Sequence, residues 1–435
     1  MLYLNLDGLT GFAEGYYPDR MARGRDLAHG AVGDLRDQLA ADEVGPLSML
    51  CKDDDLGAMV ELSDFCLGWA RQFVLLGTGG SSLGPQALAR YLGLTGTHAA
   101  MNDKGINWYF PDNLDGQDLK ALMGHLDLSA TLFLVVSKSG NTMETAIQAA
   151  IARHVLEAEG LDLRKHMLVV TQPNQSPLAD FAEANRIHQL AHPEHVGGRY
   201  AMFSVVGMFP AMLMGVDPRK LRAAGREILD QFMQMGMDHD AVRSAIAMHA
   251  LQEEGYNAQV MYLYGDKSMV FGAWYRQLWA ESVGKQGSGI MTDVVGGPVG
   301  QHSQLQLHLD GPSDKIFTLL TMEDASGLLV PADEQLAPAM GAAVGLDIDQ
   351  LTSLQAEATG DALRARNAPV RRISMDGQEP EDLARLMVHM MIETIIFARL
   401  SAANPFDQPA VEEGKIRLRE LLNQRAGRME DMANP

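Results

Sequence analysis

The sequence predicts an α/β fold in which a doubly wound parallel sheet is followed by a second α/β unit and by C-terminal helices. From residue 73 onward, short apolar runs that favour strands alternate with patterns that favour helices, which is typical of parallel sheets. The run 132–136 is apolar at every position, as expected for a central strand that is covered on both faces. After a boundary near residues 215–220, the alternation of helices and strands starts again.

The first sheet is expected to contain five strands. Ser176 is a candidate N-cap of the helix that follows it, with Pro177 at the first helical position. Because the carboxyl ends of parallel strands share one edge, the turns 77–84 and 137–142 are expected at the same edge, where ligands of such sheets bind. The expected strands are 73–80, 106–112, 132–136, 166–173 and 187–193, and the expected helices are 85–94, 116–125, 146–155 and 176–186.

The rest of the chain is expected to be helices around a second sheet. Residues 1–66 are expected to be helical and to pack on the sheet, and 284–301 to be a glycine-rich loop. Further helices are expected within 221–254, 268–283 and 383–400 and from about residue 411, and strands at 258–264, 315–322 and 371–375. The chain then divides into N-terminal helices (1–66), a first sheet domain (67–216), a second sheet domain (217–380) and C-terminal helices (381–435).

The composition is that of an acidic globular protein of 435 residues, of which 46% are hydrophobic and 21% charged. A formal net charge of −21 disfavours binding to nucleic acid and to anionic membrane surfaces. An anionic substrate must therefore be held by a local pocket of donors. No apolar run is long enough to span a membrane, and the run 386–397 carries His389 and Glu393, so we expect a buried helix there.

The cysteine content indicates a reducing compartment. Cys51 and Cys66 are too few for a disulfide framework and are expected to be small core residues. The N-terminus has no basic region before an apolar stretch, so no signal peptide is expected. No CxxC, HExxH or clustered histidine spacing is present, so we expect no metal and no cofactor. These observations favour a cytoplasmic protein.

A phosphate site is the first functional hypothesis, and it rests on residues 131–145. The strand is followed at once by Ser137, Lys138, Ser139, Gly140, Asn141 and Thr142, and then by a helix that begins near Glu144 and Thr145. Such a turn offers free backbone N–H groups, several hydroxyl donors and the positive end of a helix dipole. The alternative is an ordinary strand–helix loop in which serine and threonine serve as N-caps.

The segment 77–85, GTGGSSLGP, is a second glycine-rich turn. It is not a dinucleotide fingerprint, because the third glycine would fall on Ser82, and it is not a P-loop, because no lysine follows Gly84. Its glycines, with Ser81, allow the backbone to approach a ligand closely. The alternative is a tight turn without a ligand.

Four charged residues or histidines stand in segments that favour chemistry. Glu281 in QLWAESVGK lies in the last helical turn, where a carboxylate opposes the helix dipole. Arg199 in GGR could bind an anion, and His302 in GGPVGQHS could shuttle protons. Lys415 in NPFDQPAVEEGK also opposes a dipole. Taken singly, each has a plain alternative as a surface ion pair, a structural histidine or a solvated charge.

In combination and in order, these segments resemble the phosphoglucose isomerase family. The matching segments span about residues 73–415 and read GTGGSSLGP, SKSGNTMET, VGGRYAMFSVVGMFPAMLMGVD, WYRQLWAESVGK, GQHSQLQLHLDG and FDQPAVEEGK. The wording of ESVGKQGSGI and NPFDQPAVEEGK is most similar to the isomerase part of bacterial transaldolase–isomerase fusions, although no transaldolase segment is present here. The resemblance implies two SIS-type doubly wound parallel-sheet domains with flanking helices and a helical C-terminal arm. It also implies a homodimer in which the partner subunit completes the active site.

The resemblance further implies an aldose–ketose isomerase of glycolysis and gluconeogenesis that interconverts glucose 6-phosphate and fructose 6-phosphate. Ring opening would be followed by proton transfer between C1 and C2 through a cis-enediol. In this sequence the base would be Glu281, Arg199 would face the enediolate, and His302 would open the ring with help from Lys415. Glu144 would orient the histidine, and the substrate would be held by Gln277, Gln408, Gly80, Ser81, Ser137, Lys138, Ser139, Thr142 and Thr145.

Some positions depart from the family's common wording. The loop before His302 reads GGPVGQH instead of GTNGQH, residues 139–141 read SGN instead of TFT, and Pro409 stands where tryptophan is usual. The proton-transfer set is intact, whereas selectivity, including the use of mannose 6-phosphate, is open. Two other functions compete with this one. A non-catalytic SIS module that senses a sugar phosphate would not need Glu281, Arg199, His302 and Lys415 together, so their joint presence favours the enzyme. Ser82 disfavours an NAD-dependent dehydrogenase.

Overall fold

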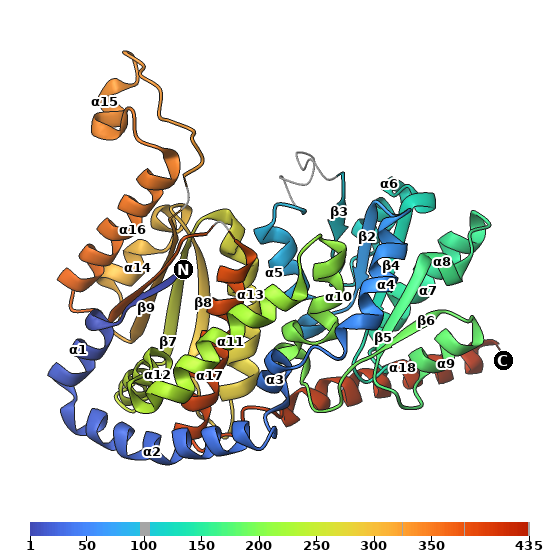
Figure 1. Ribbon diagram of the computed structural model, residues 1–435, viewed down its shortest axis with the longest axis horizontal. Helices are drawn as coiled ribbons and strands as arrows, with labels where there is room; N and C mark the ends of the chain where they lie inside the picture. The colour runs from blue at the N-terminus through green and yellow to red at the C-terminus, as the bar shows by residue number, and fades with distance from the viewer. Residues whose placement is uncertain (96–104, 324, 378, 434–435) are drawn as a thin grey trace.

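The computed structural model describes residues 1–95, 105–323, 325–377 and 379–433, with side chains up to residue 426. Two five-stranded sheets lie next to one another, and helices cover their faces (Figure 1). The first sheet has the order β3-β2-β4-β5-β6, and all its strands are parallel. Its strands are β2 (Gln72–Leu76), β3 (Asn107–Tyr109), β4 (Thr131–Val136), β5 (Met167–Thr171) and β6 (His188–Ala191).

The first sheet confirms the predicted alternation of strands and helices. Every residue of β4 is buried, as its apolar run predicts. Ser176 caps the following helix by accepting from the Ala179 N–H, and Pro177 occupies the first turn. Strand order reverses between β2 and β4, so a topological switch point lies there. The helices of this unit are α5 (Leu83–Tyr91), α6 (Gly116–His125), α7 (Met143–Ala158), α8 (Leu163–His166) and α9 (Pro177–Ala184).

The second sheet has the order β1-β10-β9-β7-β8. Its strands are parallel except β1, which pairs antiparallel with β10. An α/β architecture with two mainly parallel sheets and flanking helices is therefore confirmed, while the exact domain boundaries stay a prediction. The strands are β1 (Leu2–Asn5), β7 (Ala258–Tyr264), β8 (Met291–Gly297), β9 (Lys315–Met322) and β10 (Val370–Met375).

Two of these strands correct the sequence prediction. Residues 2–5 form β1 rather than part of a helix, because four alternating residues are too few to give a clear period of two. Residues 291–297 form β8 inside the expected loop, where two glycines and an aspartate hide the strand pattern. Both are edge strands, and both leave residues exposed or half-buried.

The helices of the second unit pack around one central helix, α17 (Pro380–Leu400). It contacts α2 (Pro18–Ala40), α11 (Pro218–Met235), α12 (Asp240–Gln252) and α13 (Met269–Val283). The buried helix expected over 386–397 is thereby confirmed. The remaining α-helices are α1 (Asp7–Tyr16), α3 (Gly45–Ser48), α4 (Leu56–Leu67), α10 (Val205–Leu213), α14 (Leu305–Asp310), α15 (Ala337–Met340), α16 (Ile348–Ala365) and α18 (Glu412–Ala433).

A fully buried ion pair fastens α17 to the second sheet. Glu393 of α17 binds Arg371 of β10, and both side chains are inaccessible to solvent. Tyr275 of α13 donates to the same carboxylate at 3.3 Å, and Thr318 accepts from the Arg371 Nε at 2.8 Å. Glu393 can therefore lie within an otherwise apolar helix, because its buried charge is paired with Arg371 and hydrogen-bonded.

The two cysteines differ in their surroundings. Cys66 is buried, and burial raises the pKa of its thiol to about 11. Cys51 is exposed, so the expectation that both are core residues is wrong for this one. It lies where a short 3₁₀ turn ends, a position that composition alone does not reveal. Within the described ranges, we find no helix with the length and apolar character needed to cross a membrane.

Because of three buried histidines, we expect the free energy of unfolding to fall in mildly acidic solution. Burial lowers the pKa of His192 and His239 to about 4 and that of His389 to about 3. These pKa values lie below the value of about 6.5 in the unfolded chain, so the unfolded chain takes up protons first as the pH falls. The contribution of each neutral, buried histidine to the free energy of unfolding is therefore complete above about pH 6.5 and is lost as the pH falls toward 4. Each histidine should lower the free energy of unfolding by about 2 kcal/mol between neutral pH and about pH 5.

Urea unfolding from pH 7.5 to 5 measures this effect. We expect His192→Gln to reduce the pH dependence, whereas His29→Gln, at an exposed position, should leave it unchanged. Equal pH dependence in the wild type and the His192 variant would contradict the assignment.

Candidate active site

The hydroxyl-rich turn after β4 forms the first part of the site. The Ser137 and Thr142 hydroxyls are 2.9 Å apart, and the Ser139 Oγ accepts from the Asn141 N–H at 3.2 Å. Gly140 has φ +66°, and a Cβ there would lie 2.1 Å from the Ser176 Oγ. The turn is therefore sharply folded against the start of α9, with its hydroxyls gathered at the first turn of α7.

One hydroxyl of this turn lacks a partner. The Thr145 Oγ1 is buried and makes no hydrogen bond within the described part of the chain. It lines a cavity of about 200 Å³ together with Ser137, Gly140 and Thr142. Beside this turn, burial lowers the pKa of Lys138, and the nearby Glu194 partly offsets that effect. An unpaired donor at a helix N-terminus is suited to an anion such as phosphate.

The glycine-rich turn after β2 lies between the end of β4, where the hydroxyl-rich turn begins, and the segment that carries Arg199. Residues Gly79–Ser81 form a 3₁₀ turn, and a Cβ at Gly80 would lie 2.1 Å from the carbonyl carbon of Gly198. A Cβ at Gly77 would lie 3.0 Å from the Val136 carbonyl oxygen, at the end of β4. Any side chain at Gly80 would push the Arg199 segment away. The expectation that both turns share the carboxyl edge of the first sheet is thus confirmed.

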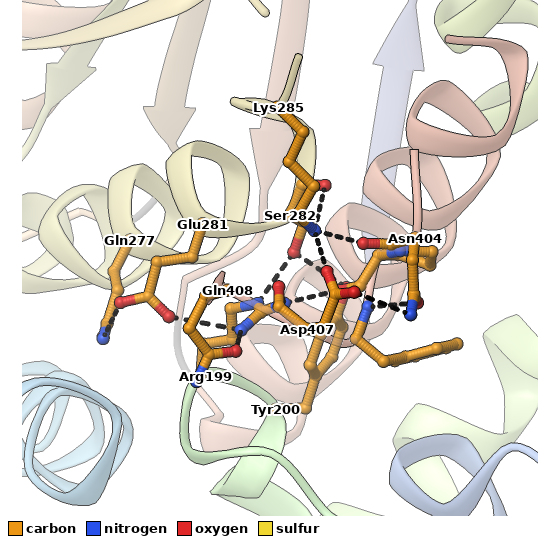
Figure 2. A network of polar contacts seen from close by, with 11 residues as sticks. Arg199, Tyr200, Gln277, Glu281, Ser282, Lys285, Asn404, Asp407 and Gln408 are labelled. Atoms are coloured by element: carbon orange, nitrogen blue, oxygen red, sulfur yellow. Dashed lines mark hydrogen bonds and ion pairs between the residues drawn. The ribbon is translucent and has the colours of Figure 1, made fainter. Parts of the chain in front are cut away.

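Arg199 is the centre of the polar network in Figure 2. It lies in the 3₁₀ segment Gly198–Phe203, and its side chain is almost fully buried. Its Nη1 binds the Glu281 Oε2 at 3.2 Å and the Gln408 Oε1 at 2.7 Å. Its Nε donates to the Ser282 hydroxyl at 2.8 Å, and its Nη2 donates to the carbonyl oxygens of Pro405 and Asp407 at 2.6 and 3.0 Å.

Glu281 occupies the last turn of α13, as predicted. Its two oxygens are held on different sides, because Gln277 Nε2 donates to Oε1 at 2.8 Å and Arg199 binds Oε2. The carboxylate keeps 27% of its side-chain surface exposed, so a ligand can reach it. A Cβ at Gly79 would lie 2.8 Å from the Gln277 Nε2, which places the glycine-rich turn beside this pair. The arrangement can remove a proton while a fixed cation stands next to it.

Three further predicted residues lie elsewhere in the chain. His302 ends a short 3₁₀ turn, Val299–His302, and is exposed, while Lys415 is exposed and pairs with Glu412 at 2.6 Å. Glu144 is half-buried in the first turn of α7. In the described part of the chain, none of the three forms a hydrogen bond or ion pair with Arg199 or Glu281.

Strand β8 stands between Glu281 and His302 in the chain. Glu281 comes shortly before the amino end of β8, and His302 follows its carboxyl end. A strand of seven residues separates its ends by about 20 Å. The two residues therefore lie beyond opposite ends of this strand in the chain.

Several residues of the network were not predicted from the sequence. Ser282 and Lys285 were within the quoted segment ESVGK, and Asp407 within FDQP, but no role was assigned to them. Tyr200 follows Arg199, and burial raises the pKa of its hydroxyl, which lies 3.1 Å from the Ser282 Oγ. Such roles depend on contacts between distant segments, for which a single sequence carries no local signal.

Comparisons with known proteins identify the family of this chain. The phosphoglucose isomerase family model matches residues 65–431. A glucose-6-phosphate isomerase of Rubrobacter xylanophilus is 33% identical over 351 residues, which are 80% of this chain and 81% of that protein. A glucose-6-phosphate isomerase of Thermus thermophilus is 33% identical over 361 residues, which are 81% of this chain and 84% of that protein.

Two solved structures have similar folds. The crystal structure of a hypothetical protein from Thermus thermophilus has a TM-score of 0.84 and 30% identity, covering 97% of this chain and 100% of that one. A glucose-6-phosphate isomerase from Chlamydia trachomatis has a TM-score of 0.73, 20% identity, and coverage of 98% and 86%.

Proposed function

The chain belongs to the phosphoglucose isomerase family, and we propose that it interconverts glucose 6-phosphate and fructose 6-phosphate. The observation that carries this proposal is the pairing of the partly exposed Glu281 with the buried Arg199. A carboxylate base beside a fixed cation is what aldose–ketose isomerisation requires, because the reaction passes through an enediolate.

In the proposed reaction, Glu281 takes the proton from C2 of open-chain glucose 6-phosphate and returns it to C1. The electron pair of the broken C–H bond forms the C1–C2 double bond, and the former carbonyl pair leaves negative charge on O1 beside Arg199. As C1 is reprotonated, the proton of the C2 hydroxyl passes to O1, which leaves the ketone at C2. Gln277 and Gln408 each donate to or accept from this pair in the structure, so they are suited to contact the sugar hydroxyls. The same residues run the reaction in reverse from fructose 6-phosphate.

The phosphate group would bind at the turn between β4 and α7. The hydroxyls of Ser137, Ser139, Thr142 and Thr145 and the backbone N–H groups at the start of α7 are suited to it. Binding at this remote end fixes the sugar relative to Glu281 and supplies binding energy away from the reacting carbons. Gly80, Ser81 and the Lys138 main chain complete this proposed part of the site.

Ring opening would require a second copy of the chain. His302 is proposed to open the ring with Lys415, and Glu144 to orient the histidine, but within one copy the seven-residue strand β8, about 20 Å long, stands in the chain between Glu281 and His302. A homodimer in which each copy supplies His302 to the other resolves this separation. Its interface is supported by exposed apolar side chains on α18 and on the arm that carries α15 (Figure 1): Leu328, Leu329, Leu336, Ile416, Leu418, Leu421 and Leu422.

A non-catalytic sugar-phosphate sensor is the second candidate. Such a protein would need the phosphate turn but not a carboxylate held against a buried guanidinium, so the Arg199–Glu281 pair favours the enzyme. As an isomerase of glucose 6-phosphate, the protein would serve glycolysis and gluconeogenesis. Two cysteines in 435 residues are too few for a disulfide framework, which favours a reducing compartment such as the cytoplasm.

A coupled assay of glucose 6-phosphate formation from fructose 6-phosphate tests the function. The wild type should turn over substrate without added metal or cofactor. Glu281→Gln should lower kcat by roughly 100- to 10,000-fold while binding of fructose 6-phosphate survives, because the amide lacks a basic oxygen. Glu157→Gln, which alters another glutamate paired with an arginine, should retain activity. Near-normal turnover by Glu281→Gln would show that another group is the base.

The phosphate site is tested by Thr145→Val, which removes the unpaired hydroxyl and keeps the side-chain volume. We expect KM for fructose 6-phosphate to rise by roughly 10-fold or more, with a smaller change in kcat, because a hydrogen bond to a charged group is lost. Thr352→Val, at a half-buried position of α16 where the hydroxyl donates to the Ile348 carbonyl oxygen, is the control. A loss confined to kcat, with unchanged substrate affinity, would contradict phosphate binding by this hydroxyl.

The shared active site is tested by mixing two inactive variants. Glu281→Gln and His302→Ala should each be inactive alone. After unfolding and refolding together at equal amounts, half of the dimers should carry one intact site of two, which gives about a quarter of wild-type turnover. Failure to regain activity, although mixed dimers form, would place both residues in the same copy's site.

A further inference from the structure

The loop 404–408 carries Gln408 and is held on two sides by two different cations (Figure 2). On its inner side, Arg199 binds the carbonyl oxygens of Pro405 and Asp407 and the side chain of Gln408. On its outer side, Lys285 binds the carbonyl oxygen of Asn404 and the Asp407 carboxylate, the latter at 3.0 Å. The loop therefore links the proposed catalytic cation to a lysine that has no part in the proposed reaction.

The Lys285 side chain is held in place by several contacts and is largely buried. Its Nζ also donates to the carbonyl oxygen of Ser282 at 3.1 Å, and its side chain is only 11% exposed. Asp407, whose Oδ1 binds the lysine, accepts from the Asn404 Nδ2 through its Oδ2 at 3.1 Å. The Asn404 Oδ1 accepts in turn from the Phe406 N–H at 3.0 Å. One ammonium group thus holds both ends of a closed, hydrogen-bonded loop.

The turn that follows α13 places Lys285 over this loop. Residues 285–288 form a two-residue hairpin turn, in which Lys285 and Ser288 exchange backbone hydrogen bonds of 3.2 and 2.9 Å. Gln286 and Gly287 have φ of 54° and 77°, the conformation of a type I′ turn, for which glycine is favoured at the second position. The lysine is therefore attached to a tight turn directly after the helix that carries Glu281.

We propose that Lys285 is a positioning residue that fixes the distance between Arg199 and Glu281 by holding the loop 404–408 in place; this rests on the isomerase function proposed above. Without the ammonium group, Asn404 and Asp407 lose their tether. The carbonyl oxygens and Gln408 then no longer fix the Arg199 guanidinium, which becomes free to move relative to the carboxylate. The phosphate turn has no contact with Lys285 among the described residues, so substrate binding should change little.

The first test is Lys285→Met, which keeps the length of the side chain and removes its charge. We expect kcat to fall by roughly 10- to 100-fold, as for a small displacement of catalytic groups, with KM for fructose 6-phosphate changed less than roughly threefold. Lys315→Met is the matched control, because Lys315 is 13% exposed and binds the Pro312 carbonyl oxygen and the Asp314 carboxylate. The control should keep wild-type kcat.

A double-mutant comparison shows whether Lys285 acts through the loop. Asp407→Asn should reduce kcat by itself, and the combination with Lys285→Met should lose no more than the larger single effect, because both variants remove the same contact. Independent, multiplying losses would overturn the proposal. Urea unfolding of each variant identifies any loss that comes from global destabilisation.

Hydrogen exchange gives a reading that does not depend on turnover. Amides of residues 404–408 should exchange faster in Lys285→Met than in the wild type or in Lys315→Met, since the loop has lost its outer tether. Unchanged exchange, or unchanged kcat in an active protein, would overturn the positioning role. A wild-type protein without turnover would instead overturn the proposed function, and exchange would still decide whether Lys285 holds the loop.

Discussion

The buried guanidinium of Arg199 is the interaction on which the site depends. A cation removed from water must be paired and hydrogen-bonded, and here its partners come from α13 and from the loop before α18. The backbone of the same segment lies against the glycine-rich turn after β2. Three parts of the chain that are distant in sequence thus meet at one group. Among the described residues, the partly exposed Glu281 is the one carboxylate that this group binds through a side-chain oxygen.

The two sheets face the site with opposite ends of their strands. The phosphate-type turn and the glycine-rich turn follow the carboxyl ends of β4 and β2, at the switch point of the first sheet. Glu281, by contrast, ends a helix that returns from β7 to the amino end of β8. The rule that ligands of parallel sheets bind at the carboxyl ends of the strands therefore applies to the proposed phosphate site but not to Glu281, the proposed base. A ligand that uses both groups must bridge the two units.

Long periodic elements were predictable from the sequence, and so was much of the site. β4, α17 and the helix that carries Glu281 show clear patterns, because burial on one or both faces fixes their composition. β1 and β8 were missed, since short edge strands are only partly buried. The meeting of Arg199, Glu281, Gln277 and Gln408 followed from a family resemblance, and the structure brings these four together. The tether through Lys285 required the fold itself.

Strand β8 acts as a rigid spacer between two proposed catalytic groups. In the proposed dimer, one copy alone would lack a ring-opening group beside its Glu281. Encounter with another copy would complete each site, and dissociation on dilution would remove activity. Specific activity would therefore depend on protein concentration.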